Sequence, residues 1–374
     1  MSSIIQNTFN PHYWDAVPFH FWSVVFFVFG SIVGSFLNVC IYRMPLNLSV
    51  VYPPSHCPHC KYAIPFYLNV PLLTWLSLGG RCKNCRAPIS PRYFIVELLT
   101  GLTFLACWLT LGPASPWIAL VCCLFLAGLI TATFIDVEHF IIPDEITLGG
   151  AVVGFIISLL LPSLHDVSTV REGLARSALG IAVGGGVVYA VLRFGKLLFG
   201  KQKVKLPTAS RIVFSETALC LPEEQIPYEE FFYRKTDAII FQATQLELVD
   251  RSYPRANVRL CPSELRIDDE IMLPENVRHM EATCSEITVP REAMGLGDVK
   301  FMAGIGAFIG WQGALFSLMA SSFIGSAVGI ILIVSRKREW SSKIPYGPYI
   351  ALGAALWVFG GKQWVATWLA SFHP

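Results

Sequence analysis

Charge is scarce in this sequence. Only 14% of its 374 residues are Asp, Glu, Lys or Arg, whereas 54% are hydrophobic. A soluble domain usually carries about 25% charged residues. Together with a mean hydropathy of +0.55, this shortage argues against a soluble domain and favours a protein that lies in lipid. The formal net charge is only +2, so the total charge predicts no nucleic-acid partner.

The N-terminal segment lacks the features of a secretory signal peptide. Residues 1–19 contain Asp15 but neither Lys nor Arg. A signal peptide begins with a positively charged region and ends at a small-residue cleavage site, and neither feature is present. We therefore interpret the first apolar run as a retained membrane anchor.

Long apolar runs dominate the rest of the chain. A helix needs about 20 mostly apolar residues to cross the hydrocarbon core of a bilayer, and two of the eight runs are short for a full crossing. The runs are Phe21–Cys40, Tyr93–Leu111, Trp117–Ile135, Thr147–Leu161, Ala175–Leu198, Phe301–Ile309, Gly313–Val334 and Tyr346–Leu369. We predict an α-helical polytopic membrane protein with about eight transmembrane helices.

Acidic residues are absent from residues 43–92, which contain six Lys and Arg residues. Positive charge marks cytoplasmic loops, so this segment is expected to face the cytoplasm and the N-terminus to lie outside. The basic cluster Arg336-Lys337-Arg338 then falls on the cytoplasmic side only if all eight runs cross the membrane.

One segment is polar rather than apolar. Residues 201–292 contain 12 Lys and Arg against 16 Asp and Glu, and stretches such as AIIFQATQLELV alternate with period 2, which predicts strands. We expect a β-rich cytoplasmic insertion here. The predicted domains are 1–43 (first membrane helix), 44–92 (zinc domain), 93–200 (helices two to five), 201–292 (insertion) and 293–374 (helices six to eight).

Four of the 11 cysteines form two CxxC pairs, Cys57 with Cys60 and Cys82 with Cys85. Disulfides seldom persist in the cytoplasm, whereas four thiolates suit a closed, structural Zn²⁺ site. A redox role for the two pairs, or a ligand role for His56 or His59, stays open as an alternative.

Two aspartates stand at apolar boundaries. Asp136 ends the run LAGLITATFI, and Asp298 follows Gly295-Leu-Gly297 before another run. The predicted topology places both at the cytoplasmic face, where a pair of carboxyl groups sharing one proton can hydrolyse a peptide bond. We expect Asp298, near a helix N-terminus, to be the ionised member and Asp136 the protonated one. We expect Gly295 and Gly297 to let the backbone bend and a substrate approach.

Simpler roles compete with this interpretation. Asp298 alone suits a helix cap and Asp136 an interface anchor, while Asp144 is expected to cap its own helix. Glu138 and His139 offer a metal site with Asp136. Glu97, inside a predicted span, is either a buried polar contact or a residue that touches substrate. A transporter or membrane scaffold with buried carboxylates is the rival from another class of protein.

At this point the sequence resembles the type IV prepilin peptidases, bacterial membrane enzymes with a Gly-x-Gly-Asp motif. The stretches that carry the resemblance are GSFLNVCIYRMP (34–45), residues 57–101 with the four cysteines, FIDVEHFIIPDEITL (134–148), GLGDVKFMAGIGAFIGWQ (295–312) and IPYGPYIALG (344–353).

The resemblance implies an aspartyl endopeptidase of the bacterial inner membrane. Such enzymes remove the basic leader from type IV pilin or type II secretion pseudopilin precursors, and many then methylate the new N-terminus with S-adenosylmethionine. Asp136 and Asp298 match the catalytic aspartates, and the four cysteines match the zinc ligands. No residue for methylation can be carried over, so a peptidase without methyltransferase activity stays an alternative.

The insertion departs from the family pattern, in which a short link precedes Gly-x-Gly-Asp. A long surface insertion adds little closure entropy, so it does not threaten the aspartates. We hypothesise that its excess of acidic residues helps to capture a basic leader; a stabilising or partner-docking module is the alternative.

Overall fold

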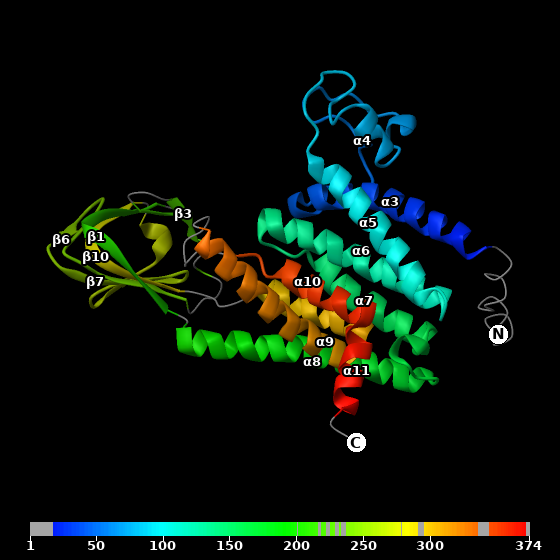
Figure 1. Cartoon of the computed structure of the whole chain (residues 1–374). Coiled ribbons are helices and arrows are strands. Elements are labelled where there is room, and N and C mark those ends of the chain that lie inside the picture. Colours follow the sequence, from blue (N-terminus) through cyan, green and yellow to red (C-terminus); the bar gives the residue numbers. More distant parts are fainter. Residues whose placement is uncertain are drawn as a thin grey trace. The chain divides into compact units, whose positions relative to one another are not determined.

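The computed structural model describes residues 18–199, 201–215, 218–221, 225–228, 232, 237–277, 279–290, 295–335 and 344–371. The chain divides into two compact units, residues 1–189 with 296–374, and residues 190–295. The first unit is helical and the second is a β-sheet unit (Figure 1). The basic cluster 336–338, used above to count membrane crossings, lies outside the described residues.

Long apolar helices make up the first unit. They are α3 (Phe19–Arg43), α5 (Pro91–Leu111), α6 (Pro116–His139), α7 (Asp144–Leu160), α8 (Val170–Phe199), α9 (Leu296–Val334), α10 (Gly347–Leu356) and α11 (Lys362–Ala370), with a π-turn at Trp357–Gly361 between the last two. Short helical segments are η1 (Met44–Leu46), η2 (Phe66–Leu68), α4 (Leu73–Ser77) and η3 (Pro162–His165).

Prolines and serines define two of these helix starts. Pro91 and Pro116 each open a helix, where a missing N–H costs nothing. The hydroxyls of Ser90 and Ser115 accept hydrogen bonds from backbone N–H groups of the first turns. Both helices therefore begin where the sequence supplies a cap and a fixed φ.

Five helices in the described part of the chain are long and apolar enough to cross a membrane, which confirms a helical polytopic membrane protein. They are Phe19–Leu46, Pro91–Leu111, Pro116–His139, Val170–Lys196 and Leu296–Val334. Helix α7 has only 17 residues. The expected runs Phe301–Ile309 and Gly313–Val334 both lie in α9, with a kink between them at Gly310 (φ 70°, ψ 179°). A positive φ suits glycine, so Gly310 is where one long helix can change direction.

Helices α3 and α5 pack closely because small residues separate them. A Cβ added to Gly34 would lie 2.7 Å from Cα of Glu97, and one added to Gly101 would lie 2.5 Å from Oγ of Ser31. Small residues at such contacts let membrane helices approach backbone to backbone. This pairing brings Glu97 beside α3 and holds together the two ends from which the cysteine loop leaves.

The second unit confirms the expected β-rich insertion. Its described strands are β1 (Lys201–Phe214), β2 (Ala218–Cys220), β3 (Gln225–Pro227), β4 (Ile239–Ala243), β5 (Gln245–Leu248), β6 (Ser252–Tyr253), β7 (Ala256–Cys261), β8 (Glu264–Ile267), β9 (Glu270–Met272) and β10 (Met280–Pro290), with a 3-10 turn, η5, at Pro274–Asn276.

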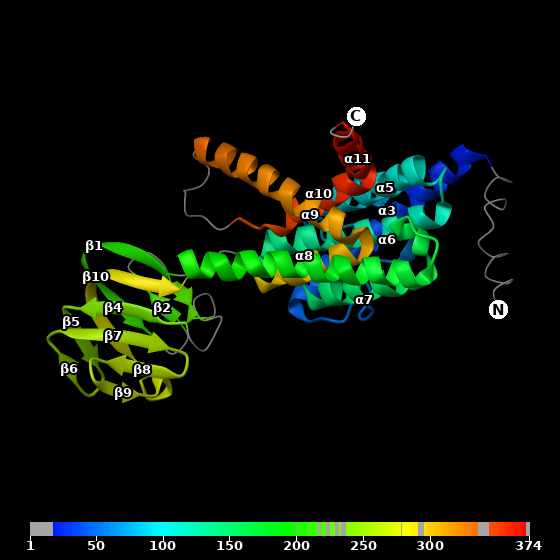
Figure 2. The same cartoon turned by 90° about the horizontal axis from the view of Figure 1, so that it is seen from below.

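These strands form an antiparallel sheet in the order β3-β2-β1-β10-β4-β7-β8-β9, with β5 pairing β10 and β6, as the adjoining arrows in Figure 2 show for β4, β7, β8 and β9. Buried and exposed residues alternate along β4 and β7. The rings of Phe214 and Phe241 stack in the core at 5.2 Å. The period-2 pattern thus reflects one core-facing side.

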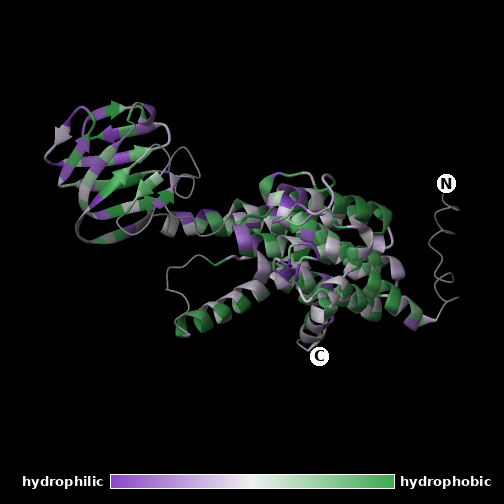
Figure 3. Ribbon diagram, turned by 90° about the horizontal axis from the view of Figure 1, so that it is seen from above, coloured by the Kyte–Doolittle hydropathy of each residue, from purple (hydrophilic) through white to green (hydrophobic). Residues whose placement is uncertain are grey.

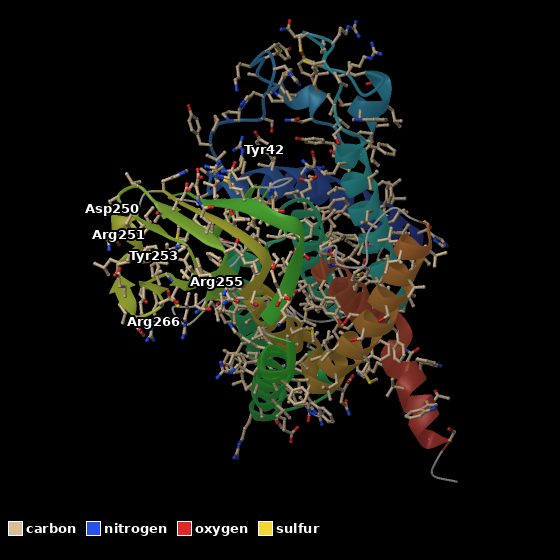
Figure 4. The ribbon with its side chains drawn as sticks, turned by 90° about the vertical axis from the view of Figure 1, so that its left-hand side faces the viewer. Tyr42, Asp250, Arg251, Tyr253, Arg255 and Arg266 are labelled. Carbon is tan, nitrogen blue, oxygen red and sulfur yellow. The ribbon has the colours of Figure 1, made fainter. Side chains whose placement is uncertain are left out.

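Side chains also join the outer strands of the insertion. Asp250, Arg251 and Tyr253 gather at its edge in Figure 4. Arg251 and the hydroxyl of Tyr253 both donate to Oε2 of Glu270, at 3.2 and 2.8 Å. These hydrogen bonds tie β6 to β9, which the sheet ladder does not pair.

Candidate active site and metal centre

Asp136 lies in the last turn of α6 and is almost fully buried, with 6% of its surface exposed. Its Oδ2 accepts a hydrogen bond of 2.9 Å from the backbone N–H of Gly347, the first residue of α10. The first N–H groups of a helix have no partner within the helix and favour a carboxylate. Helix α10 therefore points its N-terminus at Asp136.

A side chain at position 347 would displace the Asp136 carboxyl group. A Cβ there would lie 2.7 Å from Oδ2 of Asp136 and 3.2 Å from its Cγ. The sequence analysis did not single out Gly347. The signal was present, since a Gly-Pro pair ahead of an apolar run marks a helix start with free N–H groups, but nothing local linked it to Asp136.

Asp298 lies in the first turn of α9 and is half-buried. The residue before it, Gly297, would place a Cβ 3.8 Å from Cβ of Ile142, while a Cβ on Gly347 would lie 3.2 Å from Cδ1 of the same Ile142. Ile142 thus contacts both neighbourhoods. The end of α6, the start of α9 and the start of α10 meet around it.

Gly297, the glycine just before Asp298, lies inside the first turn of α9. Its φ is not positive, so the backbone conformation at this residue does not require glycine. At Gly297 a Cβ would meet Ile142 only at ordinary contact distance. Because Gly297 has no side chain, no atoms beyond its backbone cover the space next to Asp298.

Two ion pairs brace these helix ends and occupy the competing acids. Lys300 on α9 binds both carboxylate oxygens of Asp144 on α7, at 2.7 and 2.8 Å. Arg92 on α5 pairs with Glu138. The expectation that Asp144 caps its helix is wrong, because Pro143 occupies the cap position and no side-chain cap bond forms. The residues that the structure describes form no metal-binding group around Asp136.

The four predicted cysteines come together. The Sγ atoms of Cys57, Cys60, Cys82 and Cys85 all lie within 4.8 Å of one another. Cys57 and Cys85 are 3.8 Å apart, and Cys60 and Cys82 are 4.0 Å apart. Four sulfurs at about 2.3 Å from a tetrahedral Zn²⁺ stand about 3.8 Å from each other. The cluster therefore fits one zinc ion with no open position.

The two CxxC pairs adopt the same fold. In each, the residue after the second cysteine, Lys61 or Arg86, has a positive φ near 60°. Its N–H donates to the carbonyl of the first cysteine, at 2.9 Å for Lys61 and 3.0 Å for Arg86. Two equivalent turns thus present two thiols each. This arrangement is typical of zinc knuckles and does not depend on a large core.

Local donors favour the thiolate form of Cys60. The side-chain amide of Asn84 donates to Sγ of Cys60 at 3.6 Å and, with the N–H of Tyr62, lowers the pKa of Cys60 to about 6. Neither histidine joins the cluster. Nδ1 of His56 lies 3.0 Å from the carbonyl oxygen of Pro54, and His59 is exposed.

Glu97, which sequence reasoning left undecided, is buried on α5. Its Oε2 accepts a hydrogen bond of 2.7 Å from the N–H of Leu72 in the cysteine loop. It is therefore a contact between the loop and the membrane helices.

Two known families match the chain in consecutive parts. The Bacterial Peptidase A24 N-terminal domain matches residues 28–111. The Type IV leader peptidase family matches residues 123–220 and 282–330. The chain belongs to the type IV leader peptidase family. Both aspartates lie in the second match, the four cysteines lie in the first, and the intervening gap 221–281 falls in the β-sheet insertion.

Two relatives named as prepilin leader peptidase/N-methyltransferase resemble the chain, one along most of its length and one over a shorter stretch. A prepilin leader peptidase/N-methyltransferase of Aeromonas hydrophila is 28% identical over 365 residues, which cover 90% of this chain and 91% of that protein. One from Myxococcus xanthus is 44% identical over 154 residues, 40% of this chain and 43% of that protein.

A third relative matches this chain over a shorter stretch. A type 4 prepilin-like proteins leader peptide-processing enzyme of Escherichia coli is 44% identical over 145 residues, 34% of this chain and 53% of that protein. No solved structure matches the chain.

Proposed function

We propose that this protein is a membrane aspartyl endopeptidase that removes the basic leader peptide from type IV prepilins or type II secretion pseudopilins. It then N-methylates the new N-terminus. The family membership and the relatives named as prepilin leader peptidase/N-methyltransferase support both activities. The observation that supports the proposal is that Ile142 contacts both Gly297, the residue before Asp298, and Gly347, whose N–H binds Asp136.

The chemistry assigned to these two residues is acid and base catalysis. One carboxylate takes a proton from water, which attacks the peptide carbonyl, and the other carboxyl group protonates the leaving amide nitrogen. Both aspartates face a helix N-terminus, which favours negative charge. Asp298 is the anionic member in this scheme because it is half-buried in the first turn of α9, whereas Asp136 is only 6% exposed and burial disfavours the charged form. The missing side chain at Gly297 leaves room for an extended substrate next to Asp298.

We place the reaction at the cytoplasmic face of a bacterial inner membrane. The basic, acid-free segment 43–92 supports a cytoplasmic cysteine loop. Eight crossings result if α7, the two parts of α9 on either side of Gly310, and the α10–α11 segment each span the bilayer. The substrate's apolar helix then enters from lipid and its basic leader from the cytoplasm.

The cofactors in this proposal are Zn²⁺ and S-adenosylmethionine. Cys57, Cys60, Cys82 and Cys85 would hold the zinc as a structural ion, since four protein ligands leave no position for a substrate. S-adenosylmethionine would supply the methyl group for the new N-terminal amine. We assign no residue of this chain to binding it.

Separate Asp136→Asn and Asp298→Asn variants test the peptidase assignment. Each should lower the cleavage rate of a prepilin-like precursor by at least about 10²-fold, since each removes one partner in proton transfer. Cleavage is measured by mass spectrometry with protein in lipid nanodiscs, where methylation adds a methylene mass to the product. Asp144→Asn is the control, since its exposed ion pair with Lys300 contributes little stability. Near wild-type cleavage by either test variant would contradict the proposal that Asp136 and Asp298 act together in catalysis.

A further inference from the structure

A polar cluster between α3 and α5 takes no part in the proposed hydrolysis. Glu97 lies inside the candidate span Pro91–Leu111 and is only 8% exposed. In the part of the chain that the structure describes, no Lys, Arg or His forms an ion pair with it; nearby Arg92 is paired with Glu138 instead. A carboxyl group in such a place is costly and usually functional.

A strained turn in the cysteine loop positions the backbone N–H of Leu72 as a hydrogen-bond donor to Glu97. Leu72, whose N–H binds Oε2 of Glu97 at 2.7 Å, has φ 63° and ψ −54°. The N–H of Leu73 donates to the carbonyl of Pro71 at 2.6 Å, which closes a γ-turn around Leu72. A γ-turn of this hand is rare and strained for a branched residue.

Asn38 on α3 contributes a buried acceptor that has no donor. The residue is 2% exposed. Its Nδ2 donates to the carbonyls of Gly34 and Tyr93, at 3.3 and 3.1 Å, and this pair of carbonyls determines which amide atom is oxygen. Among the described residues, no partner reaches Oδ1 of Asn38. Buried acceptors are almost always hydrogen-bonded, so we expect a ligand to supply the donor to this oxygen.

The helix register places Asn38 and Glu97 in neighbouring turns of the α3–α5 pair. Gly34 packs directly on Glu97, and Asn38, one turn further along α3, bonds to Tyr93, one turn before Glu97 on α5. The positions of Asn38 and Glu97 are therefore about one helical turn apart along the helix pair. Figure 1 shows α3 and α5 crossing below the loop that contains α4. Leu72 and Tyr93, whose backbone groups bond to Glu97 and Asn38, are half-buried.

We propose that Asn38 and Glu97 bind a protonated primary amine, the free α-amino group that leader removal exposes on the substrate. This inference rests on the proposed function and assigns the amine site of its second reaction. An ammonium group offers three N–H donors and a positive charge, which match an unfilled amide oxygen and a carboxylate without an ion-pair partner. Divalent Ca²⁺ or Mg²⁺ would require more oxygen ligands than the cluster supplies.

The test uses the full chain in lipid nanodiscs and a synthetic substrate peptide that is already cut, with either a free or an acetylated N-terminus. The wild type should bind the free-amine peptide at least about 10-fold more tightly, the effect of one charged hydrogen bond. Glu97→Gln and Asn38→Leu should remove this preference. They should also raise KM for methylation of the free peptide about 10-fold, while cleavage of an intact precursor changes less than about threefold.

Thr100→Val is the matched control. Thr100 is buried in the same helix pair, and its hydroxyl bonds the carbonyl of Val96 in its own helix, so the variant should leave both reactions and the peptide preference intact.

Three results would overturn the amine site. These are equal wild-type affinity for the two peptides, unchanged methylation in both variants, or joint loss of cleavage, methylation and thermal stability, which would make the cluster purely structural. If the wild type cuts no precursor, the proposed function fails, whereas the peptide-binding comparison still decides the amine site.

Discussion

At the scale of single residues, glycine has two different roles around the aspartates. Gly347 is required by space, because its backbone N–H meets Asp136 where no side chain fits. Gly297 is not required by the fold, since its φ is not positive and a Cβ would find room. A glycine that the fold does not need, one residue before a candidate catalytic aspartate, points to contact with substrate.

The variants Gly347→Ala and Gly297→Ala separate these roles. Gly347→Ala should displace the Asp136 carboxyl group and lower the cleavage rate by at least about 10-fold, because small displacements of a catalytic group are costly. Gly297→Ala should keep or slightly raise the thermal midpoint, since alanine favours a helix by about 1 kcal/mol over glycine. Cleavage assays and thermal melts of both proteins make the comparison. Full activity of Gly347→Ala would show that α10 does not position Asp136.

At the scale of elements, the cysteine loop owes its order to two equivalent turns. Its regular structure is limited to the short segments η1, η2 and α4, so a loop of this length has too small a core to order itself alone. Four sulfurs at zinc spacing supply the missing constraint. The same loop contributes Leu72 to Glu97, so order at the cysteines extends to the membrane helices.

Cys60→Ser should release the zinc ion and loosen the loop. Metal affinity for such sites contributes directly to folding, on the order of 10 kcal/mol, so loss of one thiolate should expose the loop to proteolysis between residues 57 and 85. Zinc content by elemental analysis and limited proteolysis of the purified protein measure both effects. Cys261→Ser, a buried cysteine of the insertion, should keep its zinc. Wild-type protein that purifies without metal would refute the zinc site.

At the scale of the whole molecule, the two units differ in hydropathy. Hydrophobic residues cover much of the helical unit, while the strands mix both kinds (Figure 3). The insertion has its own core, including Ile212, Leu219 and Leu246, all fully buried. Its central part, 221–281, lies outside the family match. We therefore predict that the insertion is separable from the reaction.

Replacing residues 201–291 with a short Gly/Ser bridge should preserve folding and kcat. If the acidic insertion attracts basic leaders, KM for a basic-leader precursor should rise about 3-fold to 10-fold at low salt. A precursor with neutral residues in its leader is the control and should show no change. Added salt should abolish the difference, because it screens exposed charges. An unchanged KM at low salt would favour the stabilising or docking alternative.

Local pattern by itself determined much of this protein. Apolar runs predicted the helices α3, α5, α6 and α8, period-2 alternation predicted the insertion, and cysteine spacing predicted the four-cysteine cluster. Each of these signals lies within a short stretch, where the period of the backbone or the reach of a turn controls the outcome.

Only the tertiary structure decided how distant stretches meet. The bond from Gly347 to Asp136 joins residues 211 apart in sequence, and the pair of Lys300 with Asp144 joins residues 156 apart. The kink at Gly310 joins two runs that the sequence separated. Hydrophobic patterns state which face of a helix is apolar but not which neighbour covers it. Close packing of helices made that choice, and with it the surroundings of each acidic residue.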